Sequence, residues 1–237
     1  MVSKTALPKA VSAGFPFLSP PAAHDTIGGM DIVDREIEGY LERVGGSQDP
    51  IFSEMEDQAR KTEFPIVGPL VGRLLLQLAQ LIGARRVLEL GSGFGYSACW
   101  FQQALGSEGE LLLTDWSKEN LDLAEENVQR SGFAGTVRVF PGDALETLRG
   151  LGGEFDVIFN DTKKAQYPEV LRQCAPRLGR GGLLISDNVL WHGRVLDSKP
   201  DPDTQAVLEY NRLIFSSPEF FSVIIPLRDG VSVSRKL

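Results

Sequence analysis

The feature that most constrains the fold is a regular alternation of short apolar runs with amphipathic stretches after Gly83. Each run is rich in Val, Leu, Ile or Phe, and each is followed by apolar residues at helical spacing. We expect the runs to be β-strands, at 86–90, 110–115, 137–140, 155–159 and 182–186. Strands separated by helices form a mostly parallel sheet that is covered by helices on both faces.

The C-terminal part departs from this alternation. The apolar segments 220–227 and 231–235 are separated only by the turn Arg228-Asp229-Gly230, so they must be antiparallel to each other. The pattern therefore predicts a doubly wound, Rossmann-like α/β fold. Its sheet has seven strands and is mostly parallel, with an antiparallel C-terminal edge strand.

Residues before the sheet are expected to be helical at 31–44, 50–61 and 69–81. The third of these helices is expected to turn five leucines toward the core: Leu70, Leu74, Leu75, Leu78 and Leu81. We interpret residues 31–237 as one domain. Residues 1–30, rich in Pro, Ala and Ser, are interpreted as an N-terminal arm.

Composition narrows the possible partners. A net charge of −8 makes a nucleic acid an unfavourable partner, because phosphate backbones are bound through basic residues. No apolar run has the length of a membrane span. The two cysteines, Cys99 and Cys174, form no CxxC pair, so we expect a reducing, cytoplasmic location and buried thiols.

Acidic residues follow the predicted strands. In doubly wound sheets ligands bind beyond the carboxyl ends of the strands, so these side chains should meet at one edge. The acids are Glu89, Asp115, Asp143, Asp161 and Asp187. Taken singly, each could be an ordinary strand-end acid, but together they predict a site.

A glycine-rich turn, Gly91-Ser92-Gly93-Phe94-Gly95, follows the first of these strands. Its GxGxG spacing differs from the GxGxxG of dinucleotide-binding turns, which disfavours an NAD-dependent dehydrogenase. S-adenosylmethionine has no pyrophosphate and fits this spacing better. Asp115 is placed to accept hydrogen bonds from its ribose, Trp116 to pack on its adenine, and Asp143 to receive the adenine amine.

A second cluster has the chemistry of a metal site. Asp161, Asp187 and Asn188 offer only oxygen ligands, which suits Mg²⁺, or alternatively Ca²⁺ or Mn²⁺. Lys164 is close enough in sequence to take a proton from a substrate hydroxyl. The alternative is that Lys163 and Lys164 are solvated surface charges, and local sequence does not decide between the two.

Three segments carry a resemblance to a known family. They are Val87-Leu88-Glu89-Leu90-Gly91-Ser92-Gly93-Phe94-Gly95-Tyr96-Ser97, Asp187-Asn188-Val189-Leu190-Trp191-His192-Gly193-Arg194-Val195, and Pro226-Leu227-Arg228-Asp229-Gly230-Val231-Ser232-Val233. They resemble the cation-dependent class I O-methyltransferases, which include the caffeoyl-CoA and catechol O-methyltransferases. The resemblance covers about residues 50–237.

The resemblance implies an enzyme that uses S-adenosylmethionine and a divalent cation to methylate a small phenol with vicinal hydroxyls. It implies Lys164 as the catalytic residue. Separately, we expect a homodimer that uses the N-terminal arm and the first helices. The implied metal ligands are Asp161, Asp187 and Asn188. The expected cofactor-binding residues are Glu89, Gly91, Ser92, Gly93, Ser97, Asp115, Trp116, Asp143, Ala144 and Asp161.

Two positions depart from the family pattern. Lys163 stands where many members have an acid, and Val67 stands near the place of a hydroxyl residue. A tRNA hydroxyl methyltransferase of the same fold and a non-catalytic cofactor-binding module are therefore kept as alternatives.

Overall fold

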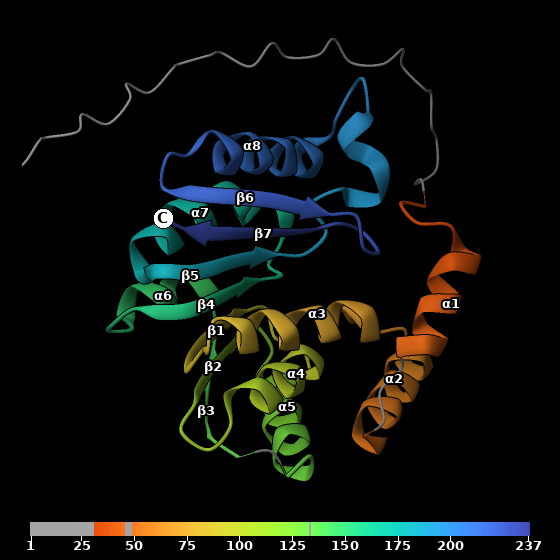
Figure 1. The fold of residues 1–237 in the computed structure, drawn as a ribbon, viewed down its shortest axis with the longest axis vertical. Helices are drawn as coiled ribbons and strands as arrows, with labels where there is room; N and C mark the ends of the chain where they lie inside the picture. The colour runs from red at the N-terminus through yellow and green to blue at the C-terminus, as the bar shows by residue number, and fades with distance from the viewer. Residues whose placement is uncertain (1–30, 46–48, 133) are drawn as a thin grey trace, which may run out of the picture.

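The structure, a computed structural model, describes residues 31–45, 49–132 and 134–237 and contains one seven-stranded sheet (Figure 1). The predicted N-terminal arm lies outside the described residues. The sheet order is β3-β2-β1-β4-β5-β7-β6. The strands are β1 (Arg86–Leu90), β2 (Glu110–Asp115), β3 (Thr136–Pro141), β4 (Phe155–Asn160), β5 (Leu178–Ser186), β6 (Phe220–Ile225) and β7 (Val231–Lys236).

The doubly wound, mostly parallel sheet is confirmed. Strands β1 to β5 pair in parallel, whereas β7 pairs antiparallel with both β5 and β6. The antiparallel strand thus lies inside the sheet, and β6 forms the edge. Of the predicted strands, β5 differs most, because it begins at Leu178 and carries three glycines before its apolar half.

Helices cover both faces of the sheet. They are α1 (Arg35–Gly45), α2 (Pro50–Thr62), α3 (Gly68–Leu81), α4 (Tyr96–Leu105), α5 (Lys118–Arg130), α6 (Ala144–Gly150), α7 (Tyr167–Cys174) and α8 (Pro202–Ser216). Alternate strand residues point to opposite faces: Val87 packs with the α2–α5 core and Leu88 with the α6–α8 core. Both cysteines are free and buried in these cores, as predicted.

Helix α3 buries most of the face that was predicted. Leu75 is fully buried, and Leu74 and Leu78 pack partly buried against the same core, but Leu81 is 75% exposed and does not reach the core. The packed face is set by Gly72, where an added Cβ would lie 2.1 Å from Trp100 Nε1 of α4. This close approach turns Val71 and Ala79, together with Leu75, toward α4 and the sheet.

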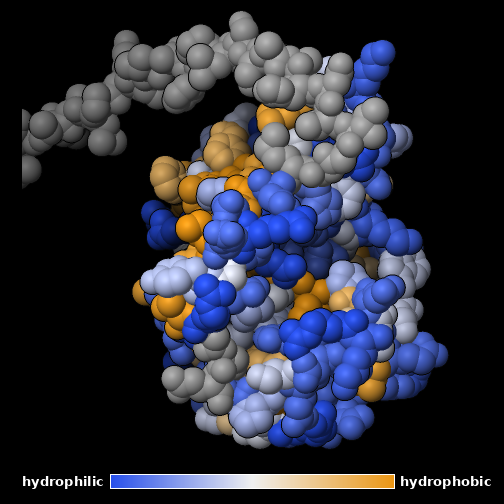
Figure 2. Space-filling model, turned by 90° about the vertical axis from the view of Figure 1, so that its right-hand side faces the viewer, coloured by the Kyte–Doolittle hydropathy of each residue, from blue (hydrophilic) through white to orange (hydrophobic). Residues whose placement is uncertain are grey.

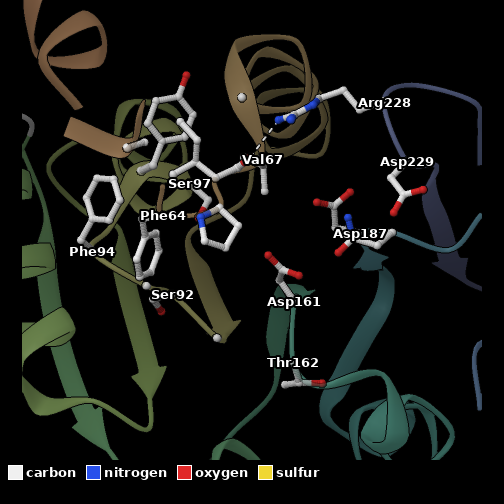
Figure 3. Close-up of a pocket in the computed structure, with 18 of the residues that line it drawn as sticks. Phe64, Val67, Ser92, Phe94, Ser97, Asp161, Thr162, Asp187, Arg228 and Asp229 are labelled. Carbon is white, nitrogen blue, oxygen red and sulfur yellow. Dashed lines mark hydrogen bonds between the residues drawn. The ribbon is translucent and has the colours of Figure 1, made fainter. Parts of the chain in front are cut away.

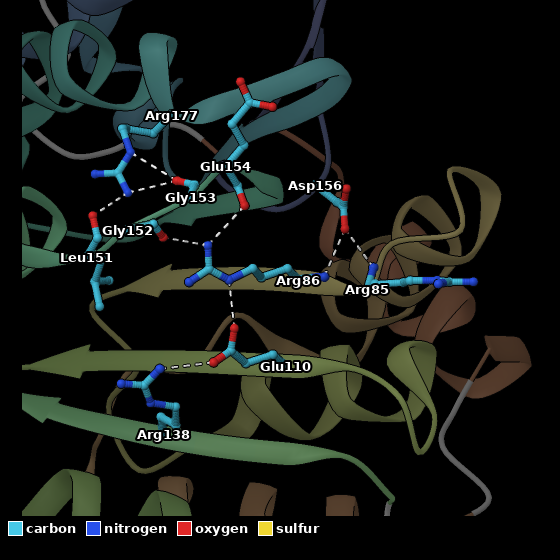
Figure 4. Close-up of polar contacts among 10 residues, drawn as sticks. All are labelled: Arg85, Arg86, Glu110, Arg138, Leu151, Gly152, Gly153, Glu154, Asp156 and Arg177. Carbon is cyan, nitrogen blue, oxygen red and sulfur yellow. Dashed lines mark hydrogen bonds and ion pairs between the residues drawn. The ribbon is translucent and has the colours of Figure 1, made fainter.

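The amino ends of the strands are held together by arginines (Figure 4). Arg86 Nε donates to Glu110 Oε2 (2.7 Å), and Arg86 Nη1 donates to the carbonyl oxygens of Gly152 and Glu154. Arg177 donates to the carbonyl oxygens of Leu148, Leu151 and Gly153. These bonds satisfy loop carbonyls that the sheet leaves unpaired.

None of the helices in the described ranges is long and apolar enough to cross a membrane.

We predict that Arg86→Met lowers the free energy of unfolding by about 1–3 kcal/mol, because a charged donor to several partners is lost. For a domain of this size that corresponds to roughly 2–4 °C in Tm for each kcal/mol. Thermal unfolding measures the change, and cofactor affinity should stay the same because Arg86 lies at the opposite end of the sheet from the site described below.

The matched control is Arg180→Met. Arg180 is exposed on β5, and its side chain makes no ion pair or hydrogen bond with the other described residues. Its change should fall within about 0.5 kcal/mol of zero. An equal loss in both variants would contradict the role given to Arg86.

Candidate active site

A pocket of about 1100 Å³ opens at the carboxyl ends of the parallel strands (Figure 3). Its inner wall comes from the glycine turn after β1 and from the residues that follow β4 and β5. Its outer wall comes from α1, α2, the 64–69 segment, the 3₁₀ turn Trp191–Leu196 and the β6–β7 turn. Among the predicted site residues, those lining it are Gly91, Ser92, Gly93, Ser97, Asp115, Asp161, Lys164, Asp187 and Asn188.

Two carboxylates and one amide meet at the ends of β4 and β5. Asp187 is only 5% exposed, and its Oδ1 is buried without a hydrogen-bond partner. Burial, followed by the nearby charge of Asp161, raises the pKa of Asp187 to about 7. Burial also raises the pKa of Asp161. Asn188 adopts a left-handed backbone (φ 54°), a conformation that asparagine tolerates better than most residues.

Lys164 lies beside these three side chains and is buried. It begins the 3₁₀ turn Lys164–Gln166, and its Nζ donates to Asn188 Oδ1 and Tyr167 Oη, both at 2.7 Å. The same Nζ lies 3.5 Å from Asp161 Oδ1. The surface alternative is therefore excluded for Lys164, whereas Lys163 is exposed, with its Nζ 5.8 Å from the centre of the Trp116 ring.

The oxygen set fits a hard divalent cation. Asp161, Asp187 and Asn188 provide carboxylate and amide oxygens, and the unpartnered Asp187 Oδ1 is a buried acceptor that a cation would satisfy. No group of three or more His, Cys, Asp or Glu side chains in the described part of the chain has the arrangement of a metal site. The set here contains only two carboxylates, so its third oxygen must come from the amide.

The glycines of the turn are required by close packing within the protein. At Gly91 (φ 90°) a Cβ would lie 2.4 Å from the carbonyl oxygen of Asp161. At Gly95 (φ 91°) a Cβ would lie 2.8 Å from Ala124 of α5. The turn is thus pressed against both the loop that follows β4 and helix α5, and any side chain at these positions would separate them.

Glu89 lies beneath this turn and is fully buried. Ser97 Oγ donates to Glu89 Oε1, while Glu89 Oε2 has no partner. Burial raises the pKa of Glu89 to about 8, with smaller contributions from the charges of Asp161 and Asp115. An unpaired buried acceptor at the end of β1 fits the amino group of S-adenosylmethionine.

Asp115 is already engaged with its own loop. It accepts hydrogen bonds from the backbone N–H groups of Gly93 (3.0 Å) and Ser117 (2.8 Å) and from Asn120 Nδ2 (3.2 Å). These bonds hold the carboxylate at the end of β2, where it borders the pocket. Its predicted contact with the ribose remains a prediction.

Four predicted cofactor residues do not line this pocket: Glu89, Trp116, Asp143 and Ala144. Asp143 caps α6 by accepting from the N–H groups of Leu145 and Glu146, and it also accepts from Gln166 Nε2. Trp116 is 61% exposed, beside Lys163. Their contacts with the cofactor remain predictions.

Several pocket residues were not predicted from sequence as part of the site. Arg228 has a left-handed backbone (φ 50°), donates to the Ile66 carbonyl (2.8 Å) and lies 3.7 Å from Glu38 of α1. Asp229 accepts from the His192 N–H and leaves its buried Oδ2 without a partner. In the sequence, nothing indicated that the adjacent charged residues Arg228 and Asp229 of this tight turn would border a pocket.

Comparison with known proteins places this geometry in a family. A family model described as O-methyltransferase matches residues 46–237. The chain belongs to the O-methyltransferase family. This O-methyltransferase is 31% identical over 199 residues to a catechol O-methyltransferase of Niastella koreensis, covering 81% of this chain and 90% of that one. It is also 31% identical to a caffeoyl-CoA O-methyltransferase of Eucalyptus globulus, covering 70% and 72% of the two chains.

Solved structures agree. An O-methyltransferase of Streptomyces achromogenes involved in tomaymycin synthesis, solved in complex with SAM, superposes with a TM-score of 0.77 at 27% identity. The superposition covers 85% of this chain and 96% of the Streptomyces achromogenes chain. An O-methyltransferase of Bacillus cereus in complex with SAH has a TM-score of 0.76 at 27% identity, covering 85% and 97%. The protein is therefore an S-adenosylmethionine-dependent methyltransferase, and the dehydrogenase and non-catalytic alternatives are not supported.

We predict that Glu89→Gln stabilises the cofactor-free protein and weakens cofactor binding. A carboxyl group whose pKa rises on folding, here from its ordinary value of 4.5 to about 8, makes folding less favourable as pH increases across that range. Glu89→Gln has no carboxyl group at this position, so it does not lose this folding stability as pH increases. Its Tm should exceed that of the native protein by about 2 °C or more at pH 8, and by much less at pH 5.

Thermal unfolding at several pH values measures the first effect, and titration calorimetry with S-adenosylmethionine the second. A Tm difference that does not change between pH 5 and pH 8 would contradict the raised pKa of Glu89. Glu108→Gln, at an exposed residue before β2, is the control and should change neither quantity.

Proposed function

We propose that this O-methyltransferase requires a divalent cation, Mg²⁺ in the first instance, and methylates one of two adjacent hydroxyls on a catechol-like phenol. The observation that carries the proposal is the cluster at the ends of β4 and β5. There, Asp161, Asp187 and Asn188 converge beside the buried Lys164, next to the glycine turn. The names of the catechol and caffeoyl-CoA relatives support the same substrate class.

Asp161, Asp187 and Asn188 would hold the cation, and two adjacent hydroxyls are the substrate arrangement that suits an oxygen-rich, partly open site. When bound, the cation supplies positive charge that favours loss of a proton from a substrate hydroxyl. The glycine turn and Glu89 would hold S-adenosylmethionine, which would supply the methyl group for the deprotonated oxygen and leave as S-adenosylhomocysteine.

The Nζ atom of Lys164 takes up the proton that leaves the substrate hydroxyl. Tyr167 keeps this nitrogen in place, because its hydroxyl accepts from Nζ and donates in turn to the Asp187 carbonyl oxygen (2.8 Å). The Trp191 ring, 5.2 Å from Nζ, borders the pocket beside it. The chain thus contributes positioning and a proton acceptor in a partly desolvated site.

We predict that EDTA abolishes methyl transfer to 4-methylcatechol and that added Mg²⁺ restores it. The measurement is transfer of labelled methyl from S-adenosylmethionine, with thermal unfolding in EDTA as the check that the protein stays folded. Full activity in EDTA would refute the metal requirement.

We predict that Lys164→Ala lowers kcat by about a hundredfold or more, the usual range for loss of a general base. Affinity for S-adenosylmethionine should change much less, because Lys164 contacts the metal-side residues. Steady-state kinetics and calorimetry separate the two. Lys199→Met, at an exposed lysine outside the pocket, is the matched control, and unchanged kcat in Lys164→Ala would remove this residue from the reaction.

Association as a homodimer and a cytoplasmic location also remain proposals. The first is supported by α1, which buries none of its side chains and leaves Ile37, Tyr40 and Val44 more than half exposed. The tRNA alternative is weakened by the net charge of −8 and by the acidic rim described next.

A further inference from the structure

The outer part of the pocket, unlike the inner part at the strand ends, is lined by exposed acidic side chains. From its residues we infer that the enzyme selects catechols whose side chain carries a positive charge over catechols whose side chain carries a negative one. The inference rests on the proposed function, since it assumes that the adjacent hydroxyls face Asp161 and Asp187. The remainder of the substrate would then extend toward the outer wall.

Four acidic side chains from three elements line the outer part of the pocket. They are Glu42 of α1, Glu56 of α2, Glu63 at the C-terminal end of α2 and Asp203 of α8. Glu42, Glu63 and Asp203 are exposed at the rim and have no ion pair with a basic residue in the part of the chain that the structure describes. The described rim therefore carries an excess of negative charge.

The arginines of the outer wall are already paired. Arg60 pairs with Asp57 on its own helix, and Arg228 is held by Glu38 and by the carbonyl oxygen of Ile66. Gly68 fixes the second arrangement, because a Cβ there would lie 2.4 Å from Arg228 Nη1. Each guanidinium already has a carboxylate partner, which reduces its attraction for a carboxylate or phosphate on a substrate.

The two lysines of the pocket do not neutralise the negative charge of the rim. Lys164 is buried and bonded to Asn188 and Tyr167. Lys163 lies over the Trp116 ring, beside Asp115, on the cofactor side of the pocket. A negatively charged substituent that extends toward α1 and α2 would be repelled by these acids. No unpaired basic side chain among the described residues of the outer part of the pocket would offset this repulsion.

Two acidic groups of the wall, one of them buried, are arranged to receive a hydrogen-bond donor. Asp229, 8% exposed, lines the pocket with its Oδ2 unpartnered (Figure 3). Glu56 is fixed in place because the hydroxyl of the buried Tyr96 donates to its Oε1 (2.7 Å). An ammonium group is a donor and a cation, and so matches both features.

Apolar side chains line the same pocket as the acids. Phe64, whose ring centre is 5.0 Å from that of Phe94, lies against the glycine turn, and Ile66 and Trp191 also line the pocket. Figure 2, which faces the side carrying α1 and α2, shows mainly hydrophilic residues around a recess where hydrophobic ones are visible. A pocket with oxygen ligands, apolar side chains and exposed acids suits a catechol ring with a short cationic side chain.

The family-model match begins at residue 46, so Glu42 and the partner of Arg228, Glu38, lie outside the matched range.

The test compares three catechols that differ only in the side chain at position 4: 2-aminoethyl, ethyl and 2-carboxyethyl. We expect kcat/KM to fall in that order, with at least about a tenfold difference between the cation and the anion at low salt. The difference should shrink in 0.5 M NaCl, because salt screens exposed charges.

The decisive variant carries Glu42→Gln, Glu63→Gln and Asp203→Asn, and it should reduce the cation-to-anion ratio to near one. A matched variant with Glu108→Gln, Glu126→Gln and Glu219→Gln makes the same change in net charge at exposed positions outside the pocket and should keep the native ratio.

Methylation of 4-ethylcatechol without a preference for the cation over the anion would overturn this inference and leave the proposed function intact. A preference that the rim variant retains would also overturn it. Methylation of none of the three, with S-adenosylmethionine still bound in calorimetry, would overturn the proposed function itself.

Discussion

The contact on which the site depends is the one between Gly91 and the backbone of Asp161. The absence of a side chain at Gly91 lets the turn after β1 press against the carbonyl of Asp161, and the Asp161 N–H donates to the Leu90 carbonyl oxygen (2.9 Å). The cofactor turn and the proposed metal side therefore belong to one rigid unit. Methyl transfer requires the donor and the acceptor oxygen to be held within reach of each other, and this contact fixes the spacing between their binding elements.

The polar groups at the two ends of the sheet differ in whether their hydrogen bonds are satisfied. At the amino ends, Arg86 and Arg177 donate to acceptors that would otherwise be unsatisfied. At the carboxyl ends, Glu89 and Asp187 are buried acids with an unpartnered oxygen each, and burial raises the pKa of both. A domain tolerates such unfavourable groups only because its remaining interactions are satisfied, and such groups concentrate at functional sites.

The fold was predictable because its signals are local: apolar runs, helical periodicity and a tight final turn. The strand-end acids and the glycine turn were also within reach, since parallel strands bring their carboxyl ends to one edge. What sequence did not reveal depends on distant contacts. The exposure of Leu81 follows from Gly72 packing on Trp100, and the place of Arg228 at the pocket follows from its bond to Ile66. Lys163 and Lys164 are neighbours with opposite environments, and only the direction of each side chain separates them.

The origin of the pocket walls has a consequence for how this enzyme could diverge. The groups proposed for the chemistry follow the strands, whereas Glu42, Glu56 and Phe64 precede the first strand and take no part in the sheet. If the acidic rim selects substrates as inferred above, exposed residues such as Glu42 and Glu63 could change the substrate preference while the residues that follow the strands stay the same. The two parts are nevertheless tied together: Arg228 joins the β6–β7 turn to Glu38 and Ile66, the Tyr96 hydroxyl of α4 donates to Glu56 of α2, and Phe52 stacks on Trp100. New specificities are therefore expected from substitutions at exposed positions of α1 and α2, and not from exchange of the whole segment.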